Sequence, residues 1–453
     1  MIEEITIFIA LFTTILFVFS LISRRIERTV ITAPMVFLTA GFLLGPSGTD
    51  IITFETENSV ILLIAEIALV FTLFSDSSRI GLKGLKESGT LPPRLLGIGL
   101  PLTILAGTIA AIGIFPGLTI VGAAILATLL APTDAALGEA IVSNKKVPLR
   151  IRQALNVEAG LNDGAVIPVL TFLVAITLLG AQAHTAGYWI FTSVGEIILA
   201  LIVGVSVGLA GGWLINRAEE QRWMEGTYTW IALMAVAFVA YIVADILNSS
   251  GFIAAFIAGM AIGTRYERLI ASLVDFTTAQ GRILGHLVFF TLGAGSYLLI
   301  ENFSISVVVY AVLSLTIIRI LPVAIALTGT GLKRNSVLFI GWFGPRGLAS
   351  IVLLLTVMEE LQDYPGMETI VLAAIATVTL SVFAHGISTN LGITRYARHA
   401  ETFGENAPEY EAVLELPAKL GRDITDMIAQ ARGLGHKDTK DRQGGDDNPD
   451  RFK

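Results

Sequence analysis

Two carboxylates and an amide lie close together inside an apolar stretch. Residues 156–164 read Asn-Val-Glu-Ala-Gly-Leu-Asn-Asp-Gly, and they include Glu158, Asn162 and Asp163. Glu158 and Asn162 share a helix face, and Asp163 lies about 100° further round. A carboxylate buried in a membrane must be protonated, paired or bound to a cation, because a bare charge is too costly to bury. Asp163 could therefore hold a proton or a cation, each displacing the other. A purely structural salt bridge is the alternative for both acids.

The composition indicates that this stretch crosses a membrane. Of the 453 residues, 54% are hydrophobic and 15% are charged, whereas a soluble chain carries about a quarter charged residues. The apolar runs are continuous over about 20 residues, which favours helical spans over the alternating strands of a barrel. The chain has no cysteine, which excludes disulfides and thiolate metal sites. We expect an all-α polytopic membrane protein.

A window of about 20 apolar residues predicts about 13 transmembrane helices. Basic residues gather in alternate loops, as at Arg24, Lys145 and Arg217, whereas the other loops carry acids such as Asp50 and Glu359. The positive-inside rule then places the N-terminus outside and the C-terminus in the cytoplasm. The predicted spans lie at 4–23, 30–48, 57–76, 95–115, 118–141, 152–180, 187–215, 227–247, 250–264, 283–300, 304–329, 335–358 and 368–392.

Two predicted spans are interrupted by proline, at Pro-Thr-Asp (132–134) and at Gly-Pro-Arg-Gly (344–347). Proline opens a helix, and carbonyls freed beside Thr133 and Asp134 could coordinate a cation. A carboxylate such as Asp134 compensates the N-termini of half-helices, and a guanidinium such as Arg346 compensates C-termini. Broken helices in matching positions of two halves favour inverted repeats with a site between them. A kinked packing helix with Asp134 on its surface is the alternative.

Few other charged residues fall inside the predicted spans. Arg319 needs an acidic partner, and we expect Glu158, which leaves Asp163 for its ligand; the alternative is that Arg319 extends to the membrane interface. Glu66 is expected to be either a further ligand or part of a structural pair. Asp76 and Glu139 are expected at span ends, within reach of water. His385 is expected to be a capping or interface residue.

These motifs resemble those of bacterial and archaeal sodium/proton antiporters of the monovalent cation–proton antiporter superfamily, on the NhaP-like electroneutral branch. The resemblance covers about residues 5–395, and Gly-Phe-Ile-Ala-Ala-Phe at 251–256 and His385-Gly386 add to it. It implies an NhaA-like antiporter fold, in which inverted repeats carry two unwound helices that cross near the midplane. The family also implies a homodimer.

The resemblance divides the predicted membrane domain, residues 1–398, into two parts. A core part comprises the spans at about 95–180 and 304–392, and a dimerisation part comprises those at about 4–76 and 187–300. Residues 399–453 change to polar composition, and we expect a cytoplasmic, largely disordered tail.

The resemblance also implies a role for each candidate residue. Asp163 is similar to the carboxylate that binds the cation and the proton. Asp134 and Thr133 would complete the site for the transported Na⁺, Asn162 would support it, and Glu158 would pair with Arg319. Glu66 resembles a third-span acid of some members only. Ala159 stands where the family often has serine, so the ligand set is expected to be thinner or completed by water.

We therefore expect a secondary antiporter in the cell (plasma) membrane that exchanges Na⁺, or alternatively Li⁺ or K⁺, for H⁺ by alternating access. One titrating carboxylate beside the neutral Asn162 predicts one-for-one, electroneutral exchange. The partners expected are these cations, protons, the lipid bilayer and a second copy of the chain, with no nucleic acid. No enzymatic activity is expected, and no cofactor beyond the transported Na⁺ and H⁺.

Three alternatives remain open. One is a K⁺/H⁺ antiporter of the same fold. A cation channel predicts a continuous pore without proton coupling, which two broken helices around a buried carboxylate disfavour. An intramembrane aspartyl protease is suggested by Gly-Leu-Asn-Asp at 160–163, but Asn162 stands where that family has glycine, and no span carries a Tyr-Asp motif.

Overall fold

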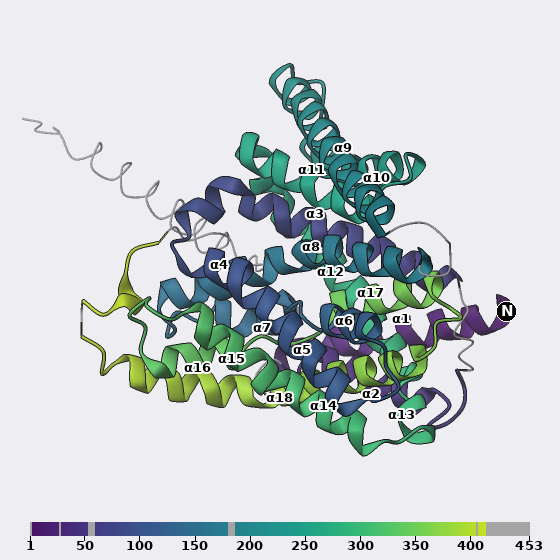
Figure 1. Ribbon diagram of the computed structural model, residues 1–453. Coiled ribbons are helices and arrows are strands. Elements are labelled where there is room, and N and C mark those ends of the chain that lie inside the picture. The colour runs from purple at the N-terminus through teal and green to yellow at the C-terminus, as the bar shows by residue number, and fades with distance from the viewer. Residues whose placement is uncertain (1, 27–28, 53–58, 180–185, 405, 414–453) are drawn as a thin grey trace, which may run out of the picture.

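The computed structural model describes residues 2–26, 29–52, 59–179, 186–404 and 406–413. These residues form helices joined by short loops, and no strand occurs among them, so the prediction of an all-α protein is confirmed (Figure 1). The helices are α1 (Ile2–Ile26), α2 (Ala33–Leu44), α3 (Ser59–Glu87), α4 (Leu91–Arg94), a π-helical turn η1 (Leu95–Gly99), α5 (Leu100–Ile114), α6 (Ile120–Leu129), α7 (Ala135–Val142), α8 (Leu149–Leu179), α9 (Ala186–Glu220), α10 (Gly226–Ile246), α11 (Gly251–Arg265), α12 (Glu267–Gly295), α13 (Leu298–Glu301), α14 (Ile305–Leu315), α15 (Ile317–Ala326), α16 (Arg334–Trp342), α17 (Leu348–Glu360), α18 (Met367–Ala400) and a short 3-10 turn η2 (Pro408–Tyr410).

Eight helical segments of the described chain are long and apolar enough to cross a membrane. Each predicted span lies on one or more helices, but several are short or broken: α2 has 12 residues, α11 has 15, and the pairs α6–α7 and α16–α17 are interrupted. The exact number of spans therefore stays a prediction.

Helices α3 and α11 approach each other closely because glycines line their contact. A Cβ atom added at Gly263 would overlap the carbonyl of Ser78, and one added at Gly259 would overlap the carbonyl of Phe74. The backbone of Gly81, inside α3, has φ 56°, a conformation that favours glycine. Small residues let membrane helices pack backbone to backbone, which creates a rigid pair beside α8.

Two stretches of non-helical chain interrupt the bundle where the sequence predicts breaks. Residues 130–134 separate α6 from α7, and residues 343–347 separate α16 from α17. The two stretches touch, because the Asp134 N–H donates a hydrogen bond to the carbonyl of Pro345 at 2.7 Å. Helix α8 passes beside this crossing and contacts both α6 and α7 on one side and α3 on the other (Figure 1).

The segment that follows α18 packs back onto the bundle. The fully buried Glu409 accepts hydrogen bonds from the N–H of Lys333 and the hydroxyl of Ser336, both at 2.7 Å, at the start of α16. Arg150, at the start of α8, donates to the carbonyl of Pro408 at 2.7 Å and pairs with Glu411 at 2.8 Å. Residues 406–413, named here the C-terminal segment, thus connect the ends of two helices. Residues 414–453 lie outside the described residues, and their predicted disorder stays a prediction.

Candidate cation site

Helix α8 carries Glu158, Asn162 and Asp163, and all three side chains are buried. The helix runs without interruption through Pro168. Its glycines permit close neighbours: a Cβ atom added at Gly160 would lie 2.6 Å from Cδ1 of Ile80 on α3, and one at Gly164 would overlap the ring of Phe256 on α11. The acidic stretch therefore lies at the surface along which α8 packs against α3 and α11.

Glu158 and Arg319 form a buried, two-point ion pair. Arg319 Nη1 lies 2.6 Å from Glu158 Oε1, and Nη2 donates to Oε2 at 2.8 Å. Both side chains are almost fully enclosed, so Arg319 does not extend to the membrane interface. Gly344 makes room for the guanidinium, because a Cβ atom there would lie 2.5 Å from Arg319 Nε. The pair joins α8 to α15, and each charge offsets the cost of burying the other.

Thr133 and Asn162 connect the first unwound stretch to α8. Asn162 Nδ2 donates to Thr133 Oγ1 at 2.7 Å, and both side chains are buried. The amide oxygen of Asn162 is also buried and has no hydrogen-bond partner among the residues that the structure describes. A buried acceptor with a free lone pair suits a cation or an ordered water. It lies one residue from Asp163.

Asp134 caps two helices at once. Its Oδ2 accepts from the N–H of Leu348 at 2.7 Å, at the start of α17, and its Oδ1 accepts from the N–H of Leu137 at 3.2 Å, in the first turn of α7. A Cβ atom at Gly347 would overlap this carboxylate, so the glycine permits its approach. A negative charge at two helix N-termini compensates the exposed N–H groups of both half-helices.

Arg346, in the second unwound stretch, binds backbone carbonyls of the first. Its guanidinium is fully buried and donates through Nη1 to the carbonyls of Ala131 and Pro132, the latter at 3.0 Å. These carbonyls follow the C-terminus of α6, where the helix dipole is negative. Each unwound stretch therefore carries the charged residue that compensates the other.

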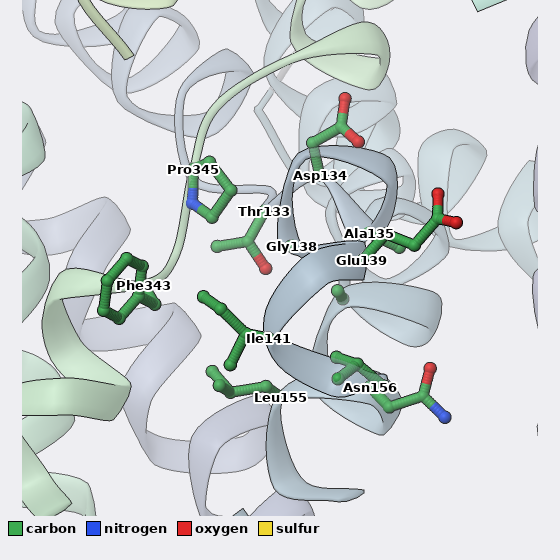
Figure 2. A pocket seen from close by; sticks show the side chains of 12 residues that line it. Thr133, Asp134, Ala135, Gly138, Glu139, Ile141, Leu155, Asn156, Phe343 and Pro345 are labelled. Carbon is green, nitrogen blue, oxygen red and sulfur yellow. The ribbon is translucent and has the colours of Figure 1, made fainter. Parts of the chain in front are cut away.

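A pocket opens beside the crossing (Figure 2). In Figure 2 the hydroxyl of Thr133 faces the space between the lining residues, whereas the carboxylate of Asp134 points away from it, in agreement with its bonds to α7 and α17. Ala159 contributes a methyl group to the wall, where a serine would contribute a hydroxyl. The lining residues are Thr133, Asp134, Ala135, Gly138, Glu139, Ile141, Val142, Leu155, Asn156, Ala159, Phe343 and Pro345.

This geometry agrees with a family match that covers most of the chain. A family model described as "Sodium/hydrogen exchanger, transmembrane" matches residues 7–391. The chain belongs to the sodium/hydrogen exchanger family. The resemblance recognised in the sequence is thereby confirmed, and the chain is a multi-pass membrane protein of a family of transporters, not of enzymes.

Other sodium/hydrogen exchangers and related antiporters are similar over large parts of the chain. The K(+)/H(+) antiporter NhaP of Alkalimonas amylolytica is 29% identical over 344 residues, which is 74% of this chain and 57% of that protein. An uncharacterized Na(+)/H(+) exchanger, YjcE of Escherichia coli K12, is 28% identical over 56% of this chain and 46% of its own length. The chain thus spans about half the length of the curated relatives it matches.

The fold is shared with a solved exchanger structure. The sodium proton antiporter MjNhaP1 of Methanocaldococcus jannaschii, determined at pH 8, superposes with a TM-score of 0.71 at 20% sequence identity. The superposition covers 87% of this chain and 99% of that one. The predicted antiporter fold is therefore supported at the level of overall architecture.

Glu66 lies near other acids and does not line the pocket. Its electrostatic neighbours are Glu359, Asp245 and Glu360, at the ends of α17 and α10, and it is not among the residues that line the pocket. Burial, and next the charge of Glu359, raise the pKa of Glu360, which follows the predicted span ending at residue 358. The structure groups Glu66 with these acids, and its role as a ligand stays a prediction.

Asp76 is the acid that sequence reasoning misplaced. The expectation of a water-exposed position is wrong, because its side chain is only 2% exposed and pairs with Arg79 one turn further along α3. A Cβ atom at Gly160 would lie 3.8 Å from Asp76 Cβ, so this carboxylate lies opposite the acidic stretch of α8. The three-residue spacing of an acid and a base, in a serine-rich stretch that follows an apolar run, is the signal that could have indicated a pair.

His385 contacts the end of a half-helix. Its Nε2 lies 2.8 Å from the carbonyl of Trp342, the last residue of α16, and its Nδ1 lies 3.1 Å from the hydroxyl of Ser381. The side chain is buried. This arrangement agrees with the expected capping role. Among the described residues, no group of three or more His, Asp or Glu side chains could hold a metal ion.

Proposed function

We propose that this protein exchanges a monovalent cation for protons by alternating access, with Asp163 as the shared binding group. The observation that carries the proposal is the ion pair of Glu158 with Arg319 on one face of α8. It commits one of the two α8 carboxylates to a structural role. We assign the alternation between a proton and a cation to Asp163, the other α8 carboxylate. It follows Asn162, whose buried amide oxygen has no hydrogen-bond partner among the described residues.

Two further ligands are proposed from their connection to this stretch of α8. The hydroxyl of Thr133 faces the pocket and accepts a hydrogen bond from Asn162, the residue before Asp163. Asp134 contributes negative potential near the site while it holds α7 and α17 in position. We infer a ligand set of Asp163, Asn162 and Thr133, completed by water because Ala159 supplies no hydroxyl.

The cycle has one proton and one cation. With the site open outward, Asp163 takes a proton and releases the cation. The core part of the molecule then moves, so that the site faces the cytoplasm. There the proton leaves and a cytosolic cation replaces it. Because Asn162 is neutral, both loaded states carry the same charge, so the exchange is electroneutral. A channel is disfavoured because the Asp134–Pro345 and Arg346–Ala131 contacts connect the two unwound stretches directly.

The proposed movement takes place between two parts of the molecule. The core part contains the spans at about 95–180 and 304–392, and the dimerisation part contains those at about 4–76 and 187–300. In this division Gly160 and Gly164 of α8, in the core part, face Ile80 on α3 and Phe256 on α11, in the dimerisation part, so α8 lies at the proposed boundary. A homodimer in the plasma membrane, with the N-terminus outside and the C-terminus in the cytoplasm, completes the proposal.

Na⁺ is the proposed cation, and K⁺ is the second candidate. Several relatives are named K(+)/H(+) antiporters, and the missing hydroxyl at Ala159 relaxes the demand for the short bonds that a small ion prefers. Purified full-length protein in proteoliposomes, assayed with Na⁺, Li⁺ and K⁺ against an imposed pH gradient, tests the proposal. Proton movement that depends on one of these cations is expected, and its absence with all three would contradict the function.

A further inference from the structure

An ion pair crosses the pocket margin between two helices that otherwise make little contact. Arg282 Nη2, on α12, lies 2.8 Å from Glu139 Oε1, on α7. Glu139 is one of the pocket-lining residues. Helix α7 packs mainly on α8 and α18, whereas α12 packs mainly on α2 and α3. The pair therefore joins two groups of helices that pack largely among themselves.

The exposure of this pair differs from that of the structural pair on α8. The side chains of Arg282 and Glu139 are 47% and 21% exposed, whereas Arg319 and Glu158 are 2% and 3% exposed. A half-exposed ion pair on long side chains contributes little to stability, so it can break and form again readily. A buried pair cannot break without leaving an unpaired charge. The exposed pair is suited to a contact that changes during transport.

The pair lies next to the first unwound stretch and the pocket, so its state would affect both. Glu139 lies on the short half-helix that follows the first unwound stretch, about 1.4 turns beyond Asp134. A movement that separates α7 from α12 by more than the two side chains can span would therefore break the Glu139–Arg282 contact. In the arrangement seen here the pair is closed, and the pocket extends from Thr133 to Glu139 and Asn156.

We propose that Glu139 and Arg282 form a latch that holds the pocket in the arrangement seen here and breaks when the core part moves. We assign this arrangement to the cytoplasm-facing state, because both residues adjoin loops that the proposed topology places in the cytoplasm. This inference rests on the proposed function, because the latch acts on alternating access. The latch makes Glu139 and Arg282 positioning residues that set the balance between the two states of the site.

Cross-linking tests whether the contact must break. The chain has no cysteine, so Glu139→Cys with Arg282→Cys introduces the only thiols, and a short, reducible bifunctional thiol reagent can bridge them in proteoliposomes. Bridging is expected to stop exchange, and reduction to restore it. A matched control is Asn216→Cys with Glu220→Cys, an exposed pair within α9 at 2.9 Å, whose bridging should leave exchange unchanged.

Two outcomes would overturn the latch. One is full exchange in the bridged protein. The other is an equal loss of exchange when the same double variant carries two monofunctional reagents, because the block would then be steric. The unbridged variant separates the latch from the function on which it rests: if it exchanges none of Na⁺, Li⁺ and K⁺ for protons, and the parent chain also fails, the proposed function is wrong and the latch falls with it.

Variants that neutralise or reverse the two charges test the ion pair itself. Glu139→Gln and Arg282→Gln are each expected to raise the apparent KM for the cation on the cytoplasmic side by about two- to fivefold, the range of a partly exposed ion pair. The reversed pair, Glu139→Arg with Arg282→Glu, is expected to return KM toward the parent value. A reversed pair no better than the worse single variant would overturn the latch, as would unchanged KM in both single variants.

Discussion

Thr133 and Asn162 are joined by a 2.7 Å hydrogen bond that connects the unwound stretch before α7 to the helix carrying Asp163. The bond uses the amide nitrogen of Asn162, which leaves the amide oxygen buried without a hydrogen-bond partner among the described residues. This bond holds the unwound stretch against α8 one residue before Asp163, and it leaves a neutral buried oxygen on that helix.

Asp163→Asn removes the group that is proposed to alternate between proton and cation. We expect cation-dependent proton movement in proteoliposomes to fall to the level of empty vesicles, while thermal unfolding in detergent stays close to that of the parent. Asp363→Asn, which changes an exposed acid in the loop after α17, is the control and should exchange normally. Exchange that survives in Asp163→Asn would reject the assignment.

Asn162→Asp adds a second carboxylate next to the first. If both acids titrate, the charge carried in the two directions differs, and exchange is expected to generate a current on a solid-supported membrane. The parent is expected to generate none, because its site has one titrating carboxylate beside a neutral amide. A sustained stoichiometric current from the parent protein would contradict electroneutral exchange.

Competition at one carboxylate predicts the pH dependence of transport. Lowering the pH protonates Asp163, so the apparent KM for the cation should rise, approaching about tenfold per pH unit on the acid side of the titration. The maximal rate at saturating cation should change much less, because the cation displaces the proton. Initial rates over a matrix of pH and cation concentration measure this, and a pH-independent KM would exclude a shared site.

Breaking the buried ion pair should destabilise the protein more than removing it. Glu158→Gln leaves the Arg319 guanidinium buried without its partner, with an expected loss of about 3–5 kcal/mol. The double variant Glu158→Gln with Arg319→Gln buries no unpaired charge and should recover much of that stability. Unfolding temperatures in detergent test this, and a double variant less stable than either single one would argue against a directly coupled pair.

The C-terminal segment predicts a position-dependent effect of truncation. Ending the chain after residue 413 retains the bonds of Glu409 to Lys333 and Ser336 and should leave the unfolding temperature unchanged. Ending it after residue 404 exposes these donors, and Glu409→Ala leaves them unpaired, with an expected loss of about 1–3 kcal/mol. Equal stability of the two truncated chains would show that the segment contributes nothing.

The sequence alone determined the membrane class, the helical architecture and the short set of candidate residues. Continuous apolar runs leave few charged residues inside spans, so the pairing of Glu158 with Arg319 could be expected simply because partners are scarce. The two proline breaks could be predicted from local sequence, because proline interrupts a helix and the glycines beside Pro345 favour an opened backbone. The opposite signs of Asp134 and Arg346 already indicated which helix ends each would compensate.

Only the tertiary structure decided which distant groups meet. No sequence spacing relates Asp134 to the N–H of Leu348, or Glu139 to Arg282, because these contacts depend on how separate helices cross. The same limit explains the two acids of α3: Glu66 and Asp76 are both acids in an apolar helix, yet one lies among other carboxylates and the other pairs with Arg79 opposite α8. A residue's cost of burial can be read from its type, but the partner that compensates it is set by packing.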